Sequence, residues 1–196
     1  MDRFDGREDI MEAARDLLIQ IGEAHALYLQ LSYNYWIQHA LFTWQWWFLL
    51  LILVIPWYFW WLMVDKRRLL EIWCYGAMTF IAVQAADTAG VANALWMYPI
   101  RLLPKSPHML SIDITILPII FMQIYQSYSQ WKAFIIASFI MAACLAFIAE
   151  PILVWMGIYE LLNWKYYYSF PIYILITVTL KCIMETIKSL QQKNAT

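Results

Sequence analysis

Three carboxylates, Asp87, Asp113 and Glu150, lie within or beside stretches of sequence that are almost entirely apolar. A carboxylate is a side chain that can hold a cation or an amine, or exchange a proton with a ligand. Charged groups are costly inside a membrane, so they face the interior of a helical bundle, pair with another group or mark a site. We expect these three residues to form the centre of a functional site.

The composition of the chain indicates a multi-pass membrane protein. Of its 196 residues, 63% are hydrophobic, only 14% are charged and 12 are Trp. No water-soluble surface can accommodate this composition, so we expect membrane lipids as partners and no nucleic acid. Cys74, Cys144 and Cys182 lie in separate apolar segments without the spacing of a metal site or a disulfide framework. We therefore expect no metal and no cofactor, and we interpret the cysteines as small packing residues.

Five segments are apolar over roughly the 20 residues that a helix needs to cross a bilayer. They cover residues 42–64, 69–96, 107–128, 131–155 and 169–188. Ser106 is expected to cap the third helix, with Pro107 at its first position. The sequence predicts an all-α membrane protein: a bundle of about five transmembrane helices at residues 41–190, followed by a C-terminal tail at residues 191–196.

An acidic segment, residues 1–40, precedes the bundle and contains seven Asp or Glu residues against three Arg. Its apolar residues recur at the spacing of an amphipathic helix: Ile10, Ala14, Leu17, Leu18, Ile21 and Tyr28. Because this helix lacks a basic face, it is a poor match to helices that bind anionic lipid. We expect it to pack against the bundle or another subunit, so a homo-oligomer or a membrane partner is predicted.

The three carboxylates should reach one level of the membrane. Asp87 follows Leu69 by 18 positions and Glu150 follows Lys132 by 18, so at about 1.5 Å per residue both lie about 27 Å along their helices. Asp113 lies in the first two turns of a helix that runs the opposite way. All three should therefore approach the same membrane face.

Other polar and aromatic residues should surround this level. Gln84, Asp87, Gly90 and Asn93 share one helical face, which should be buried in protein. The connection to the third span should hold Arg101, Lys105 and His108 over the carboxylates. Aromatic residues available for the walls are Trp96, Tyr98, Trp155, Tyr159, Trp164 and Tyr166. The predicted site comprises Asp87, Asp113, Glu150, Arg101, Lys105, His108, Gln84, Asn93 and Tyr159.

Three functions remain open on these grounds. The favoured one is a protein whose carboxylate-lined site binds, or helps to transport, a small molecule, an ion or a lipid. The second is a membrane enzyme that acts on a lipid or an isoprenoid through its carboxylates. The third is a structural component in which Arg101 and Lys105 pair with the carboxylates. The sequence contains no nucleotide-binding loop, zincin helix or serine-nucleophile elbow, so ATP-driven transport and proteolysis have no support.

Charges near the ends of the spans lead to further expectations. The basic run at residues 66–68 should lie in the cytoplasm, which places the N-terminus outside and the C-terminus inside. Glu71 should pair with this run. Lys181 lies in the last span, where it should either snorkel to the interface or pair with Glu185 one turn on.

Three stretches of the chain resemble a known family: WWFLLLILVIPWYFWWLMVDKRRLLEIWCYG, YPIRLLPKSPH followed by DITILPIIFMQIYQ, and FIAEPILVWMGIYELLNWKYYYSFPIYI. The family is an uncharacterised one of small multi-pass membrane proteins from endospore-forming Firmicutes. The resemblance covers most of residues 44–176 and implies a location in the bacterial cytoplasmic membrane or the spore membrane. It also implies that the family pattern includes Asp113, Tyr125, Gln126, Glu150, Trp164 and Tyr173. It implies no mechanism.

Overall fold

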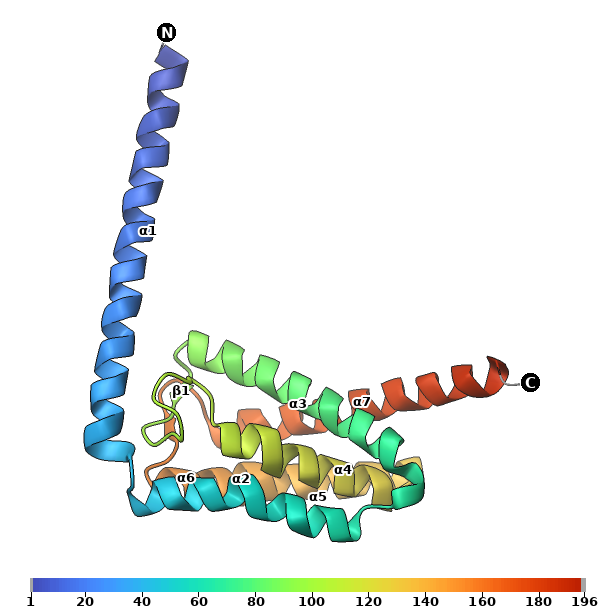
Figure 1. Cartoon of the computed structure of the whole chain (residues 1–196). Coiled ribbons are helices and arrows are strands. Elements are labelled where there is room, and N and C mark those ends of the chain that lie inside the picture. The colour runs from blue at the N-terminus through green and yellow to red at the C-terminus, as the bar shows by residue number, and fades with distance from the viewer. Residues whose placement is uncertain (1, 195–196) are drawn as a thin grey trace.

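The computed structural model describes residues 2–194, with side chains described for residues 11–193. One long helix stands apart from a bundle of helices that run side by side (Figure 1). The helices are α1 (Asp2–Tyr35), α2 (Trp44–Met63), α3 (Leu69–Ala92), α4 (Leu117–Ser127), α5 (Trp131–Cys144), α6 (Glu150–Trp155) and α7 (Tyr166–Asn194). The predicted all-α class is confirmed.

Within residues 2–194, four helical stretches are long and apolar enough to cross a membrane: Trp44–Met63, Lys66–Ala92, Trp131–Trp155 and Tyr166–Lys193. The third predicted span is shorter, because its apolar helix covers only Ile112–Ser127. These residues reach about 24 Å along a helix, less than the roughly 30 Å of bilayer hydrocarbon. Where we expected five spans, the structure thus has four of full length and a shorter helix packed among them.

This shorter helix also begins later than predicted. Ser106 was expected to cap it, and the Ser106 hydroxyl does accept a hydrogen bond from the backbone N–H of His108 at 3.3 Å. The Ser106 carbonyl, however, accepts from the Arg101 guanidinium at 3.0 Å, so it does not begin a helical hydrogen-bond ladder. Helical structure starts only at Leu110.

Two π-helical turns interrupt the bundle helices, η3 (Ile112–Ile116) and η4 (Leu145–Ala149). Each is followed within two residues by a proline, Pro118 or Pro151, which lacks an N–H and crowds the carbonyl four residues earlier. A wider turn before the proline relieves this crowding and lets the helix continue. Asp113 lies inside η3 and Glu150 directly follows η4, so each π-helical turn orients a carboxylate.

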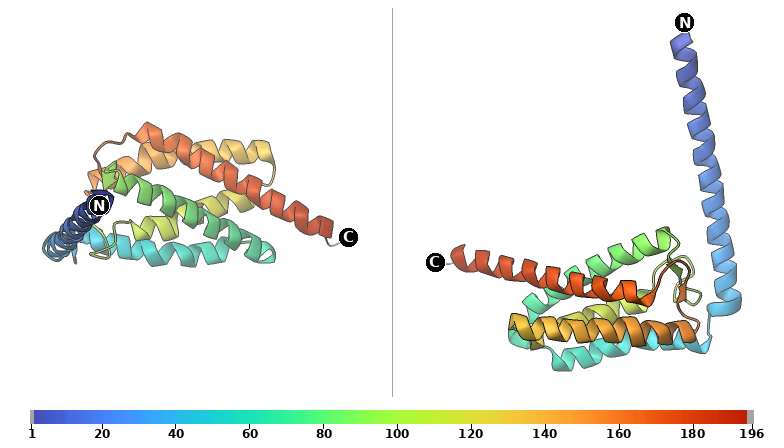
Figure 2. Two further views of the ribbon diagram at one scale, coloured as in Figure 1. Left: turned by 90° about the horizontal axis from the view of Figure 1, so that it is seen from above. Right: turned by 180° about the vertical axis from the view of Figure 1, so that it is seen from behind.

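Successive bundle helices run in opposite directions, so their connections gather at two ends (Figures 1 and 2). One end, called here the cavity end, holds the α1–α2 junction and two loops, residues 93–109 and 156–165, which we call the roof loops. The roof loops are joined by an antiparallel pairing of β1 (Trp96–Met97) with β2 (Glu160–Leu161). Gly157, at φ +70°, ends α6 in the left-handed conformation that suits glycine. The opposite end of the bundle holds the other connections and the C-terminus.

Two apolar clusters fill the interior. The larger extends between α3, α4, α5 and α7 and contains the fully buried rings of Tyr75, Phe121 and Phe134. The smaller cluster lies under the roof loops and includes Leu49, Ile100, Met109, Ile158 and Tyr159. The outer side of α2 instead exposes large apolar side chains, as expected for a helix that faces lipid.

At the end opposite the cavity, Glu71 joins three helices. Its carboxylate accepts hydrogen bonds from Arg68 at 2.9 and 3.1 Å, from the Tyr125 hydroxyl at 2.5 Å and from Lys188 at 2.9 Å. The expectation that Glu71 pairs with the basic run is met by Arg68. The contacts from α4 and α7 come from parts of the chain that sequence spacing did not connect to Glu71.

The prediction for Lys181 is wrong. Its side chain is 2% exposed and donates to the carbonyls of Tyr128 and Ser129 at 3.0 and 2.8 Å, while Glu185 accepts from the indole N–H of Trp131. These two carbonyls directly follow the last residue of α4, Ser127, and a cation is favourable beside the C-terminus of a helix. Lys181 therefore closes the C-terminal end of α4 instead of reaching for water.

Three smaller expectations also differ from the structure. The side chains at residues 11–28 of α1 are all exposed, so packing of α1 against the bundle is confined to residues 29–40, and the alternative of packing against another subunit stays a prediction. Cys74, Cys144 and Cys182 are exposed and do not fill packing sites. The predicted tail is helical through Asn194, and residues 195–196 lie outside the described part of the chain.

We expect Lys181→Met to destabilise the protein by about 1–3 kcal/mol, because two carbonyls at the end of α4 lose a charged donor. The measurement is thermal unfolding of the purified protein in detergent. Lys132→Met is the matched control, since Lys132 is exposed at the start of α5. Equal stability of the two variants would contradict the role given to Lys181.

Candidate functional site

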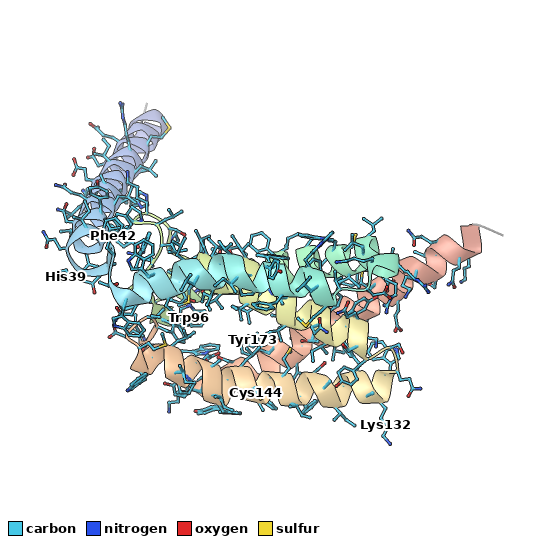
Figure 3. The ribbon with its side chains drawn as sticks, turned by 60° about the horizontal axis from the view of Figure 1, so that its bottom comes forward. His39, Phe42, Trp96, Lys132, Cys144 and Tyr173 are labelled. Carbon is cyan, nitrogen blue, oxygen red and sulfur yellow. The ribbon has the colours of Figure 1, made fainter. Side chains whose placement is uncertain are left out.

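A cavity of about 340 Å³ lies beneath the roof loops, between α3, α4, α6 and α7. Asp87, Asp113 and Glu150 all contribute to its wall, so the structure brings the three carboxylates together. Most of the remaining wall is apolar or aromatic, with rings from Trp96, Tyr98, Tyr159, Trp164 and Tyr173. In Figure 3, Trp96 and Tyr173 lie between the bundle helices, with Trp96 toward the cavity end and Lys132 at the other end.

Asp87 is 5% exposed and is surrounded by donors from the first roof loop. Its Oδ1 accepts from the Trp96 indole N–H at 2.9 Å and from the Tyr98 hydroxyl at 2.5 Å. The Nδ1 of His108 lies 2.9 Å from Oδ2. The Asp87 carboxylate therefore fastens the loop to α3, and both of its oxygens have partners.

Gly90 allows this arrangement by leaving room for an indole. A Cβ atom at position 90 would lie 1.9 Å from Cζ2 of Trp96, which is far inside van der Waals contact. The Trp96 ring thus lies against the backbone of α3, one turn after Asp87, and makes edge contacts with Trp164 and Tyr159 at centroid distances of 5.1 and 6.4 Å.

Two tyrosines of the roof loops stay protonated beside the carboxylates. Burial, followed by the nearby charge of Asp87, raises the pKa of Tyr98 well above its ordinary value. Burial also raises the pKa of Tyr159, whose ring stacks on Tyr98 at 5.5 Å. Both hydroxyls therefore remain neutral across the physiological pH range, and Tyr98 remains a donor to Asp87.

Glu150 receives its hydrogen bonds from the first turns of α7. The Ser169 hydroxyl donates to Oε2 at 3.0 Å, and the Tyr173 hydroxyl donates to Oε1 at 2.9 Å. Ser169 in turn accepts from the Trp164 indole N–H at 2.9 Å. The sequence analysis did not find Ser169, and it named Tyr173 only through a resemblance. Their spacing of four residues in an apolar helix was the available signal, since it puts two polar groups on one face.

Asp113 differs from the other two carboxylates. Its side chain is 4% exposed, it lines the cavity, and its Oδ2 is buried without a hydrogen-bond partner among the described residues. Burying an unpaired carboxylate oxygen is costly, so native structures leave few of them. Asp113 is therefore the one of the three carboxylates with a buried oxygen that accepts no hydrogen bond from the described residues.

The predicted pairing of Arg101 and Lys105 with the carboxylates is wrong for the described part of the chain. Arg101 donates to the Ser106 carbonyl at 3.0 Å and to the Ser32 hydroxyl at 2.7 Å, and Lys105 is exposed. Both acceptors of the Arg101 guanidinium are neutral: the Ser106 carbonyl belongs to the same loop, and the Ser32 hydroxyl belongs to α1. Arg101 thus joins α1 to the roof instead of neutralising the site.

Of the other predicted residues, some line the cavity and others lie outside it. Tyr159 and Asn93 line the cavity, although the Asn93 amide donates to the Ala89 carbonyl within α3. Gln84 lies outside the wall, and Trp155 is 84% exposed. Tyr166 does not line the cavity either. Within residues 11–193, no group of three His, Cys, Asp or Glu side chains is arranged to hold a metal ion.

Comparison of the chain with family models, with curated proteins and with solved structures finds no match. The fold and composition therefore define the class of protein. It is an integral membrane protein built as an α-helical bundle, with four helices that can span the bilayer.

We expect Gly90→Ala to lower the free energy of unfolding by about 1–3 kcal/mol, because the added Cβ must push Trp96 away from α3 and from Asp87. Thermal unfolding measures the loss. Gly22→Ala is the control, since a Cβ there meets nothing within 4 Å, and it should be neutral or stabilise by up to about 1 kcal/mol. Equal effects would show that the contact between Trp96 and α3 is unimportant.

The raised pKa values of Tyr98 and Tyr159 predict a dependence of stability on alkaline pH. Unfolded tyrosine releases its proton near pH 10, whereas the folded protein holds these two protons to higher pH. Stability should therefore fall above pH 10, by up to about 1.4 kcal/mol per pH unit for each group. The variant Tyr98→Phe/Tyr159→Phe should show a shallower fall than the wild type. Tyr33→Phe, at an exposed position of α1, should leave the slope unchanged.

Proposed function

We propose that the protein binds, or helps to transport, a small ligand with an apolar body and a cationic or hydrogen-bond-donating group. The observation that supports this function best is the buried, unpartnered Oδ2 of Asp113 in the wall of a cavity shared with Asp87 and Glu150. The ligand's donor group would contact Asp113, and its apolar part would fill the remaining space.

The charges of the cavity support a cationic ligand. The only side chain in ion-pair distance of the three carboxylates, among the described residues, is His108 beside Asp87. Glu150 is held by the neutral hydroxyls of Ser169 and Tyr173, which stabilise a carboxylate without cancelling its charge. Negative charge in an apolar cavity has to be offset by a proton or by a bound cation.

The shape and lining of the cavity support a ligand of small-molecule size. Its volume of about 340 Å³ falls within the range of about 300–1,000 Å³ typical of ligand pockets. The rings of Tyr98, Tyr159 and Trp164 can contact an apolar chain, and aromatic faces also attract organic cations. The combination of aromatic walls with carboxylates at one side favours an amine over an inorganic ion.

The test compares an alkylammonium ion with an alcohol of the same chain length. At about 100 times its dissociation constant, a ligand raises the free energy of unfolding by about 2.7 kcal/mol. We expect the amine to stabilise the wild type in a thermal-shift assay, and Asp113→Asn to lose most of this stabilisation. Asp65→Asn is the control, because Asp65 is exposed at the opposite end of the bundle.

Equal stabilisation by the amine and the alcohol would contradict the role of charge. Equal stabilisation of the wild type and Asp113→Asn would contradict the role of Asp113. Native mass spectrometry of the detergent-purified protein adds a measurement without an assumed ligand. A retained amine or amine-bearing lipid, lost in Asp113→Asn, supports the proposal.

We propose further that the cavity end faces the outside of a bacterial membrane, either the cytoplasmic membrane or the spore membrane. Basic residues at the opposite end support this orientation, since Lys and Arg favour the cytoplasmic side: they are Lys66, Arg67, Arg68, Lys132 and Lys188. The roof loops contain Arg101, Lys105 and Lys165. A green fluorescent protein fused to the C-terminus should fluoresce, and an alkaline phosphatase fused there should be inactive. The reverse pattern would refute the orientation.

Membership of the family of endospore-forming Firmicutes that the chain resembles is also a proposal. The positions of its pattern residues support a shared site, because Asp113, Glu150, Trp164 and Tyr173 all line the cavity. Tyr125 and Gln126 instead contact Glu71 and the backbone of Asp65 at the other end. An alignment of that family should retain the four cavity residues; frequent apolar replacement of Asp113 or Glu150 would count against a common site.

A further inference from the structure

The long helix α1 crosses the direction of the bundle helices at the cavity end. Figure 1 and the right-hand view of Figure 2 both show it nearly perpendicular to them, extending well past the side of the bundle. The spanning helices follow the membrane normal, so a helix that crosses them runs along the membrane surface. Its 34 residues reach about 51 Å, most of which has no contact with the bundle.

Residue spacing distinguishes two sides of α1, one with Leu17, Ile21 and Tyr28 and the other with the acidic residues, next to which the exposed Ile19 and Leu27 also lie. A helix turns about 100° per residue, so residues eleven apart lie on one face. Leu17 and Tyr28 have this spacing, and Ile21 lies between them; these side chains are 60%, 49% and 64% exposed. The acidic residues Glu12 and Glu23 also have this spacing, on the opposite face. α1 therefore presents an uncovered apolar face and an opposite face that carries the acidic residues together with Ile19 and Leu27.

Polar contacts at the end of α1 determine which way the apolar face points. The Ser32 hydroxyl donates to the Pro104 carbonyl at 3.1 Å and accepts from Arg101 at 2.7 Å. The Trp36 indole donates to the Arg101 carbonyl at 2.8 Å. Ser32 follows Ile21 by eleven residues, so it lies on the apolar face. That face therefore points toward the roof loop, which is the side from which the spanning helices enter the membrane.

We propose that α1 is an interfacial helix that lies on the bilayer surface at the cavity end. Its apolar face inserts among the lipid headgroups and the ends of the acyl chains, and Glu12, Asp16 and Glu23 point to water. Because the charged face is acidic and turned outward, the attraction depends on apolar contact and needs no anionic lipid. Neutral phosphatidylcholine should therefore be sufficient.

The experiment measures the surroundings of single spin labels on the full chain in phosphatidylcholine liposomes. Cys74, Cys144 and Cys182 are first replaced by alanine, and one cysteine is then introduced for the nitroxide. The labelled variants are Leu17→Cys and Ile21→Cys on the apolar face, and Asp16→Cys and Glu23→Cys on the acidic face. All four positions are exposed, so the labels leave the packing of the bundle intact. Val54→Cys, on the outer side of α2, is the control for a site in lipid.

Collisions with oxygen, which concentrates in lipid, and with a water-soluble nickel chelate report the location of each label. We expect oxygen to dominate at Leu17 and Ile21, as at Val54, and the nickel chelate to dominate at Asp16 and Glu23. Dominance of the nickel chelate at all four α1 sites would mean that the helix projects into water and would overturn the proposal. Protection of Leu17 and Ile21 from both reagents, with dipolar broadening between labels, would assign the face to a second copy of the chain and would also overturn it.

Discussion

A carboxylate inside an apolar bundle needs hydrogen-bond donors. At the cavity end of this protein, the loops and helix ends are positioned by their hydrogen bonds to two such carboxylates. Asp87 forms hydrogen bonds with Trp96, Tyr98 and His108. These contacts hold the first roof loop against α3. Glu150 accepts hydrogen bonds from Ser169 and Tyr173. These contacts hold the first turns of α7 against α6. The two loops then meet through a short strand pairing. An unpaired charge in the hydrocarbon region would cost several kcal/mol, so these contacts are a condition for the fold as well as for the site.

Acidic side chains have different partners at the two ends of the bundle. At one end, Glu71 meets the cations Arg68 and Lys188, so its charge is cancelled by the protein. At the cavity end, hydroxyl and indole groups donate hydrogen bonds to Asp87 and Glu150, His108 lies beside Asp87, and Arg101 is directed toward Ser32. The π-helical turns next to Asp113 and Glu150 add to this difference, since regular helices would orient the carboxylates otherwise. The separation of the cavity carboxylates from Arg and Lys side chains is thus a product of the fold.

Arg101 also connects α1 to the first roof loop. It contacts Ser32 of α1 and the carbonyl of Ser106 in the first roof loop, and the same loop supplies the donors to Asp87. α1 is therefore linked through Arg101 to the cover of the cavity.

The sequence by itself determined the class of protein, the approximate positions of the four long spans and the common level of the three carboxylates. The fourth span was predicted at residues 131–155, and the helical stretch observed is Trp131–Trp155. These features follow from hydrophobicity and helical rise, which are local properties. Only the tertiary structure decided the partners: Arg101 contacts Ser32 across 69 positions, and Lys181 contacts the carbonyl of Tyr128 across 53. It also left Asp113 without a donor. A hydrogen bond needs its donor and acceptor within about 3 Å. Whether two side chains meet this condition depends on how separate helices are oriented toward one another, which residue spacing along the chain does not specify.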